Sequence, residues 1–198
     1  PFTEVKYVYN ISSVLEQTQV VYVVAAKREV IAQYYQVLKD HCGLSPKVLE
    51  PELLSLLRNI PQSMKTEEGS IFIDIDSKKI RWFALWNTAV FDTSSIEKAD
   101  LNNNCQNLIQ ELKKATEVFT KITKRKVTAI LVSGNDTDST TLTEALTPTL
   151  KIPITTIENY KLSPPPPAGR SILDYKVLGG LALKANEGSS TSSINIFK

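Results

Sequence analysis

Residues 70–91, with the sequence SIFIDIDSKKIRWFALWNTAVF, determine the expected fold class. Runs of β-branched and aromatic residues alternate there with short polar segments. This pattern predicts three strands, at residues 70–75, 80–86 and 88–91. Because the intervening segments are short, we expect the strands to pair as an antiparallel meander.

The segment after the meander predicts alternating helices and strands. Apolar residues at helical spacing indicate a long helix over residues 100–123. The Thr141-x-x-Glu144 pattern has the form of a capping box and predicts the start of a second helix, which should end near Pro148. Strands are expected at residues 127–132 and 152–157. The order meander–helix–strand–helix–strand predicts a mixed α/β sheet with packed helices.

The N-terminal part predicts a smaller arrangement of strands and helices. A strand is expected over residues 5–11, followed by a β-branched run at 20–26 that suits a strand buried on both faces. A helix over 27–42 should end at Gly43. A short strand at 47–49 and a helix from Pro51 should follow, and the polar segment 61–69 is the expected subdomain boundary.

Composition excludes several classes of function. With 198 residues, 42% hydrophobic and a net charge of +2, the chain is neither disordered nor charged enough to favour nucleic acid or an anionic membrane. His41 is its single histidine, and Cys42 and Cys105 are too few for a disulfide framework, which indicates a reducing compartment. No apolar run approaches the roughly 20 residues of a membrane-spanning helix.

Two polar clusters are candidate sites. Asp74 and Asp76 end a strand on one face, where two carboxylates can hold a divalent cation; alternatively they are solvated residues that lead into a turn. The loop from Ser133 through Gly134 and Asn135 follows a strand and precedes a helix, a geometry that can bind an anion. The alternative for this loop is an ordinary strand-to-helix turn with its own N-cap.

Five segments, in this order, resemble the type IV pilus assembly protein PilM family, whose relatives are the actin-like ATPases and the cell-division protein FtsA. They are residues 23–31 (VVAAKREVI), 42–52 (CGLSPKVLEPE), 71–76 (IFIDID), 131–135 (LVSGN) and 177–184 (VLGGLALK). The last segment, similar to the closing "GLALR" helix, is the most specific of the set.

The resemblance implies an α/β actin-like ATPase (ribonuclease-H-like) fold, partial because the first lobe is incomplete. Residues 1–60 correspond to the end of an inserted small subdomain and the start of the return to the first lobe. Residues 69–170 correspond to the second lobe, 171–185 to the closing helix, and 186–198 to a linker and tail peptide. The family's first phosphate loop lies before residue 1, so we expect an N-terminally truncated chain.

The resemblance also places a degenerate nucleotide site at Asp74, Asp76, Ser133, Gly134 and Asn135. Asp76 stands where the family has a glycine that lets backbone amides approach a phosphate, and Asn135 stands where it has a second glycine. We therefore expect no ATPase activity and no cofactor or metal for this segment, with ATP and Mg²⁺ bound only in a full-length protein.

The function implied is that of a bacterial cytoplasmic scaffold for type IV pilus assembly or a related secretion machine, recruited to the inner face of the cytoplasmic membrane. The expected partners are a PilN-like inner-membrane protein, through its N-terminal peptide, and other pilus assembly components. The tail Ile194-Asn195-Ile196-Phe197 resembles the "INLLP" peptide of PilN, as in a PilM–PilN fusion, and implies self-association through the tail. No nucleic acid and no direct membrane insertion are expected.

Two alternatives remain open at this point. The first is a nucleotide-binding actin-like ATPase whose site needs the missing N-terminal segment. The second is a ribonuclease-H-like metal-dependent nuclease that uses Asp74, Asp76 and a further acid such as Asp136.

Overall fold

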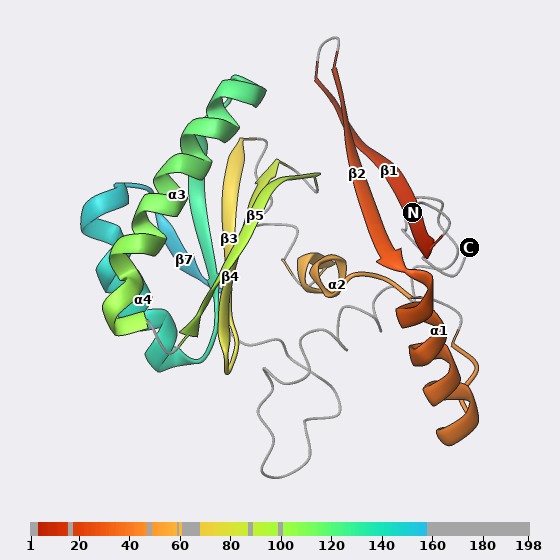
Figure 1. The fold of residues 1–198 in the computed structure, drawn as a ribbon. Coiled ribbons are helices and arrows are strands. Elements are labelled where there is room, and N and C mark those ends of the chain that lie inside the picture. The colour runs from red at the N-terminus through yellow and green to blue at the C-terminus, as the bar shows by residue number, and fades with distance from the viewer. Residues whose placement is uncertain are drawn as a thin grey trace. The chain divides into compact units, whose positions relative to one another are not determined.

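The computed structural model of the chain describes residues 4–15, 18–46, 49–58, 60, 68–86, 89–98 and 101–157. These residues belong to two compact units, one ending at Arg58 and the other containing residues 60–157 (Figure 1). No helix within the described ranges combines the length and the apolar character needed to cross a membrane.

The second unit contains a five-stranded mixed sheet in the order β5-β4-β3-β6-β7. Strands β3 (Gly69–Ile75), β4 (Lys79–Trp86) and β5 (Ala89–Glu97) form the predicted antiparallel meander. Strands β6 (Val127–Ser133) and β7 (Ile154–Thr156) continue the sheet in parallel with β3. The expected mixed α/β sheet is therefore confirmed.

Strand β5 continues beyond its predicted end at Phe91 as far as Glu97. Its second half contains Thr93, Ser94 and Ser95, which are all exposed. Because β5 is an edge strand of this sheet, its backbone can keep pairing with β4 where its side chains face solvent. Hydrophobicity alone therefore underestimates its length.

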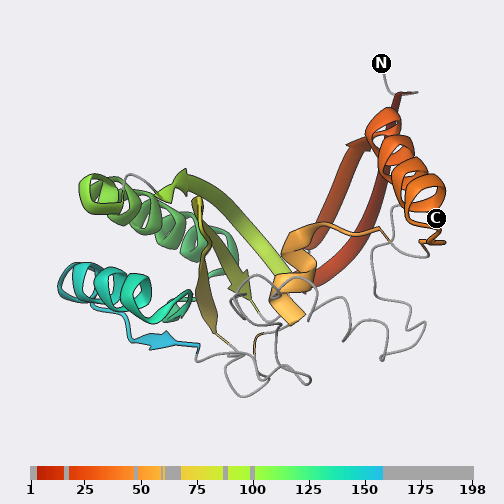
Figure 2. The ribbon, with the colours of Figure 1, turned by 90° about the horizontal axis from the view of Figure 1, so that it is seen from below.

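Helices α3 (Leu101–Thr123) and α4 (Asp136–Leu150) contact each other and lie on the same side of the sheet (Figure 2). The predicted long helix is thus confirmed almost to the residue. Alternate residues of β3 point into the core between sheet and helices, because successive side chains of a strand face opposite sides. This core contains Ile71, Ile73, Ile75, Ile80, Trp82, Leu108, Leu112, Phe119, Ile130, Val132, Leu142 and Leu146.

The capping box predicted at Thr141 and Glu144 is wrong, because α4 begins five residues before Thr141. Asn135 is the N-cap, and its side-chain Oδ1 accepts a hydrogen bond of 2.8 Å from the backbone N–H of Asp138. Thr141 lies inside the helix and donates its hydroxyl to the carbonyl of Thr137. The first turn of α4 contains no apolar residue. The helical spacing of apolar residues therefore becomes visible only at the buried Leu142 and Leu146, and it does not indicate where the helix begins.

In the first unit, β1 (Val5–Leu15) and β2 (Thr18–Lys27) form an antiparallel hairpin with a bulge between Ile11 and Ser13. The prediction that residues 20–26 are buried on both faces is wrong. Val21 and Val23 are exposed, whereas Val24 and Ala26 on the other face are half-buried. Within the described residues this two-stranded sheet has no second layer over the face that carries Val23.

Helix α1 (Arg28–Gln36) follows β2 directly and continues as a π-helical turn, η2 (Val37–His41). Gly43 ends it as predicted, with a φ of +64° that suits glycine. The last helix of this unit, α2 (Glu52–Arg58), is held to the preceding segment by Glu50, which accepts hydrogen bonds from Ser55 and Arg58.

Several expected features fall partly or wholly outside the described residues. Leu49 is in an irregular segment, and the rest of the short strand expected at 47–49 lies outside the described ranges. The same holds for the helix expected at 171–185 and for the tail.

Replacement of Gly69 by alanine tests the packing of β3 against α3. A Cβ at Gly69 would overlap the ring of Phe119 and lie 3.0 Å from the carbonyl oxygen of Lys126. We expect Gly69→Ala to lower the free energy of unfolding by about 1–3 kcal/mol, measured by urea denaturation, because overpacking strains a well-packed core.

Phe119→Leu provides the partner for a double-mutant cycle. The double variant should lose less stability than the sum of the two single variants. Gly43→Ala is the control, because a Cβ at Gly43 would meet nothing within 4 Å. Its only expected loss of stability comes from placing alanine in a left-handed backbone conformation. Additive effects of Gly69→Ala and Phe119→Leu would contradict the packing explanation.

Candidate functional site

The predicted site residues gather at one edge of the five-stranded sheet. Strands β3 and β6 are parallel neighbours, with Asp74 opposite Ser133, so the turns that follow both strands emerge at the same edge. The two turns pack closely. A Cβ placed on Gly134 would lie 3.0 Å from both the Cβ of Ile75 and the hydroxyl of Ser139. The structure thus brings together two polar clusters that are 59 residues apart in the sequence, as counted from Asp74 to Ser133.

Asp74 is paired with a cation. Its side chain is fully buried, and its Oδ2 lies 2.5 Å from Nη2 of Arg81, the residue opposite it on β4. The same Nη2 lies 3.2 Å from Oδ2 of Asp76. Arg81 therefore bridges both carboxylates and supplies the counter-charge that a bound cation would otherwise provide.

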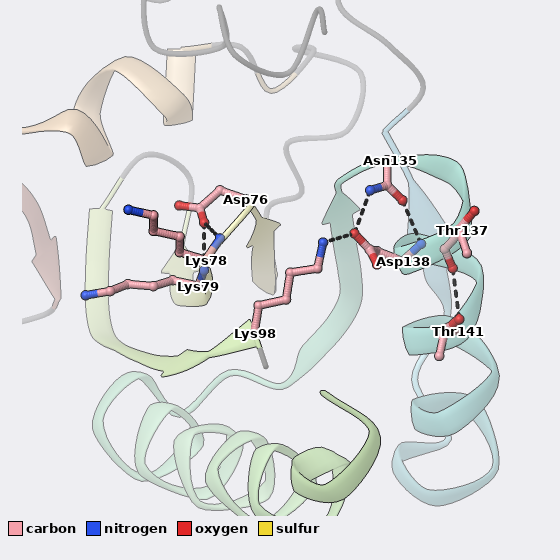
Figure 3. A network of polar contacts seen from close by, with 8 residues as sticks. All are labelled: Asp76, Lys78, Lys79, Lys98, Asn135, Thr137, Asp138 and Thr141. Carbon is pink, nitrogen blue, oxygen red and sulfur yellow. Dashed lines mark hydrogen bonds and ion pairs between the residues drawn. The ribbon is translucent and has the colours of Figure 1, made fainter. Parts of the chain in front are cut away.

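Asp76 closes the turn between β3 and β4. Its Oδ1 accepts hydrogen bonds from the backbone N–H groups of Lys78, at 2.6 Å, and Lys79, at 2.7 Å (Figure 3). These amides belong to the hairpin that the resemblance assigns to phosphate. A carboxylate of the protein itself already occupies them, so Asp76 acts as an internal anion for the turn.

Polar side chains at the start of α4 also bind one another. The carboxylate of Asp138 accepts a hydrogen bond of 2.6 Å from the amide group of Asn135 and forms an ion pair with Nζ of Lys98. Figure 3 shows Lys98 extending from the end of β5 to this helix turn. Asn135, Asp138 and Lys98 are therefore paired with one another, whereas the buried hydroxyl of Ser139 in the same turn has no hydrogen-bond partner among the described residues.

Sequence analysis did not identify Arg81 and Lys98 as members of the site. For Arg81 a signal existed, since a hairpin centred on Ser77 and Lys78 places residue 81 opposite residue 74. For Lys98 there was none, because its approach to Asp138 depends on how far β5 extends.

The described side chains include no cluster of three or more histidine, cysteine or acidic groups that suits a metal ion. The side chain of Asp136, named for the nuclease alternative, lies outside those described. Cys105 on α3 is half-buried, and this burial raises the pKa of its thiol, which disfavours the metal-binding thiolate at neutral pH. The tail residues Ile194, Asn195, Ile196 and Phe197 also lie outside the described ranges.

Comparison with known proteins identifies the fold. No family model and no curated protein matches the sequence. Among solved structures, a chain of the PilM–PilN type IV pilus biogenesis complex superposes with a TM-score of 0.65 over 92% of this chain and 67% of that one, at 18% identity. The chain has an actin-like ATPase fold. At this identity the similarity establishes the fold and not the function.

Two further structures give lower scores. A Bacteroides thetaiotaomicron protein described as having an actin-like ATPase fold and unknown function has a TM-score of 0.49 and 11% identity, over 88% of this chain and 59% of that one. The apo psk41 ParM protein has a TM-score of 0.37 and 12% identity, over 69% and 50%. The fold assignment rests on the first superposition.

Replacement of Arg81 by methionine tests the pairing of Asp74. The variant leaves a buried carboxylate without its guanidinium, and we expect the free energy of unfolding to fall by about 3 kcal/mol in urea denaturation. The double variant Arg81→Met/Asp74→Asn removes the charge as well and should recover part of the loss. Equal stability of the single and double variants would contradict a charge-pairing role.

Two substitutions at Asp76 separate the turn hydrogen bonds from the charge. Asp76→Asn keeps a side-chain oxygen for the amides of Lys78 and Lys79, whereas Asp76→Gly removes it. We expect Asp76→Gly to lose about 1–2 kcal/mol of stability and Asp76→Asn less, because only the first leaves both amides without their acceptor.

Pyrophosphate titration calorimetry on the same two variants should show binding by Asp76→Gly alone. Equal pyrophosphate binding by both variants would mean that charge, and not occupancy of the amides, keeps anions out.

Proposed function

We propose that this chain is a cytoplasmic scaffold of type IV pilus assembly or of a related secretion machine, and that it binds a PilN-like inner-membrane partner. The observation that carries the proposal is the superposition of 92% of the chain on a chain of the PilM–PilN complex. The partner would recruit the chain to the inner face of the cytoplasmic membrane, beside other pilus assembly components.

The candidate site supports a role in binding over a role in catalysis. The amides of the β3–β4 turn are bound by Asp76, and Asp138 is held by Lys98 and Asn135. A triphosphate would have to displace both carboxylates, and each would repel it at close range. In this proposal the chain is not an enzyme and has no cofactor of its own.

A nucleotide-binding ATPase is the second candidate. The observation that favours it is the meeting of two turns at the carboxyl ends of β3 and β6, a position where open α/β sheets commonly bind ligands. In this alternative, a segment outside the present chain would complete the site and displace the internal carboxylates.

Parallel titrations distinguish the two candidates. We expect a fluorescent peptide that contains the sequence Ile-Asn-Leu-Leu-Pro to bind with a dissociation constant in the micromolar range, and a scrambled peptide not to bind. For Mg-ATP we expect calorimetry to detect no binding with a dissociation constant below about 1 mM. This limit corresponds to a binding free energy of about −4 kcal/mol. A variant that lacks residues 187–198 should bind the peptide more tightly, because the tethered tail no longer competes.

The opposite results would favour the alternative. ATP binding in the low micromolar range that is lost in Asp74→Ala would establish a nucleotide site. Absence of peptide binding, with and without residues 187–198, would reject the PilN-like partner.

A further inference from the structure

The first unit contains a shallow groove of about 290 Å³ near the start of α1. Ile31, Ala32 and Tyr35 of α1 form its apolar floor, and Lys6 of β1 and Arg28 of α1 are its charged members. The groove is separate from the polar site at the edge of the five-stranded sheet, since all five residues belong to the other unit.

The helix residues of the groove share one face of α1. Positions 28, 31, 32 and 35 follow the i, i+3, i+4, i+7 spacing that places side chains along a single stripe. The stripe continues to Lys39, whose Nζ lies 5.9 Å from the centre of the Tyr35 ring. An apolar centre is therefore flanked by basic groups at both ends.

Glu29 is the one acidic residue of α1, and it is not among the residues that line the groove. Glu29 is one position from Arg28 and accepts a hydrogen bond of 3.4 Å from Gln33 on the adjoining face. No acidic residue is among the described residues that line the groove. The lining therefore has positive charge and is complementary to carboxylates.

We propose that this groove binds a short acidic amphipathic segment of a partner protein, with one or two apolar side chains flanked by carboxylates. The apolar side chains would lie on Ile31, Ala32 and Tyr35, and the carboxylates would pair with Lys6 and Arg28. The proposal does not depend on the PilN-like partner, because it is argued from the charge and shape of the groove alone.

The test is a selection of random twelve-residue peptides displayed on phage against the whole chain. We expect the enriched peptides to carry Asp or Glu on both sides of one or two large apolar residues. Synthetic copies should lose at least about tenfold in affinity for Lys6→Glu/Arg28→Glu, and affinity for the unmodified chain should fall as salt rises.

Matched controls identify the surface. Arg28→Glu alone should weaken binding, whereas Lys27→Glu, which makes the same charge change next to Arg28 but outside the groove, should leave affinity within about twofold. Ala32→Trp fills the groove and should abolish binding, whereas Val30→Trp on another face of α1 should not. Circular dichroism verifies that each variant is folded.

Three outcomes would overturn the proposal. One is enrichment of peptides without flanking acids, or of none. Another is equal weakening by Lys27→Glu and by Arg28→Glu. The third is that the chain floats with phosphatidylglycerol vesicles and loses this only in Lys6→Glu/Arg28→Glu, which would assign the basic groove to an anionic membrane surface.

Discussion

Complete burial of β3 is the constraint on which the second unit depends. Every residue from Gly69 to Ile75 is buried, with β4 on one side and β6 on the other. A strand in this position must satisfy each polar group within the protein. Asp74 meets this requirement through Arg81, directly opposite on β4. A buried strand must also fit closely against its neighbours, and at Gly69 the ring of Phe119 leaves no room for a Cβ atom. The turn that follows β3 therefore begins at a strand that is buried along its whole length.

The parts of the fold that can be predicted from sequence are those in which side-chain pattern and burial agree. Strands β3 and β4 and helix α3 combine apolar runs with burial, so the sequence pattern locates them well. The errors arise where this agreement fails. Helix α4 starts in a polar segment under the control of one capping residue, Asn135, and β2 has a β-branched sequence although Val23 is 57% exposed.

The candidate site was predictable in its location and not in its chemistry. Two strands that end in polar residues and lie parallel in one sheet must present their turns at one edge, so Asp74, Asp76 and residues 133–135 come together. The ion-pair partners of the carboxylates at this edge come from β4 and from the end of β5. Arg81 follows from hairpin register, whereas the contact of Lys98 with Asp138 requires the tertiary structure.

The two units differ in what they leave to solvent, and this difference bears on function. In the second unit, the carboxylates of Asp74, Asp76 and Asp138 at the sheet edge are paired with Arg81 and Lys98. In the first unit, large apolar side chains such as Tyr34, at 62%, and Val23 are exposed to water. Apolar surface of this kind gains free energy when another protein covers it, at roughly 25 cal/mol per Å². Covering this apolar surface would therefore contribute free energy to the association that we propose.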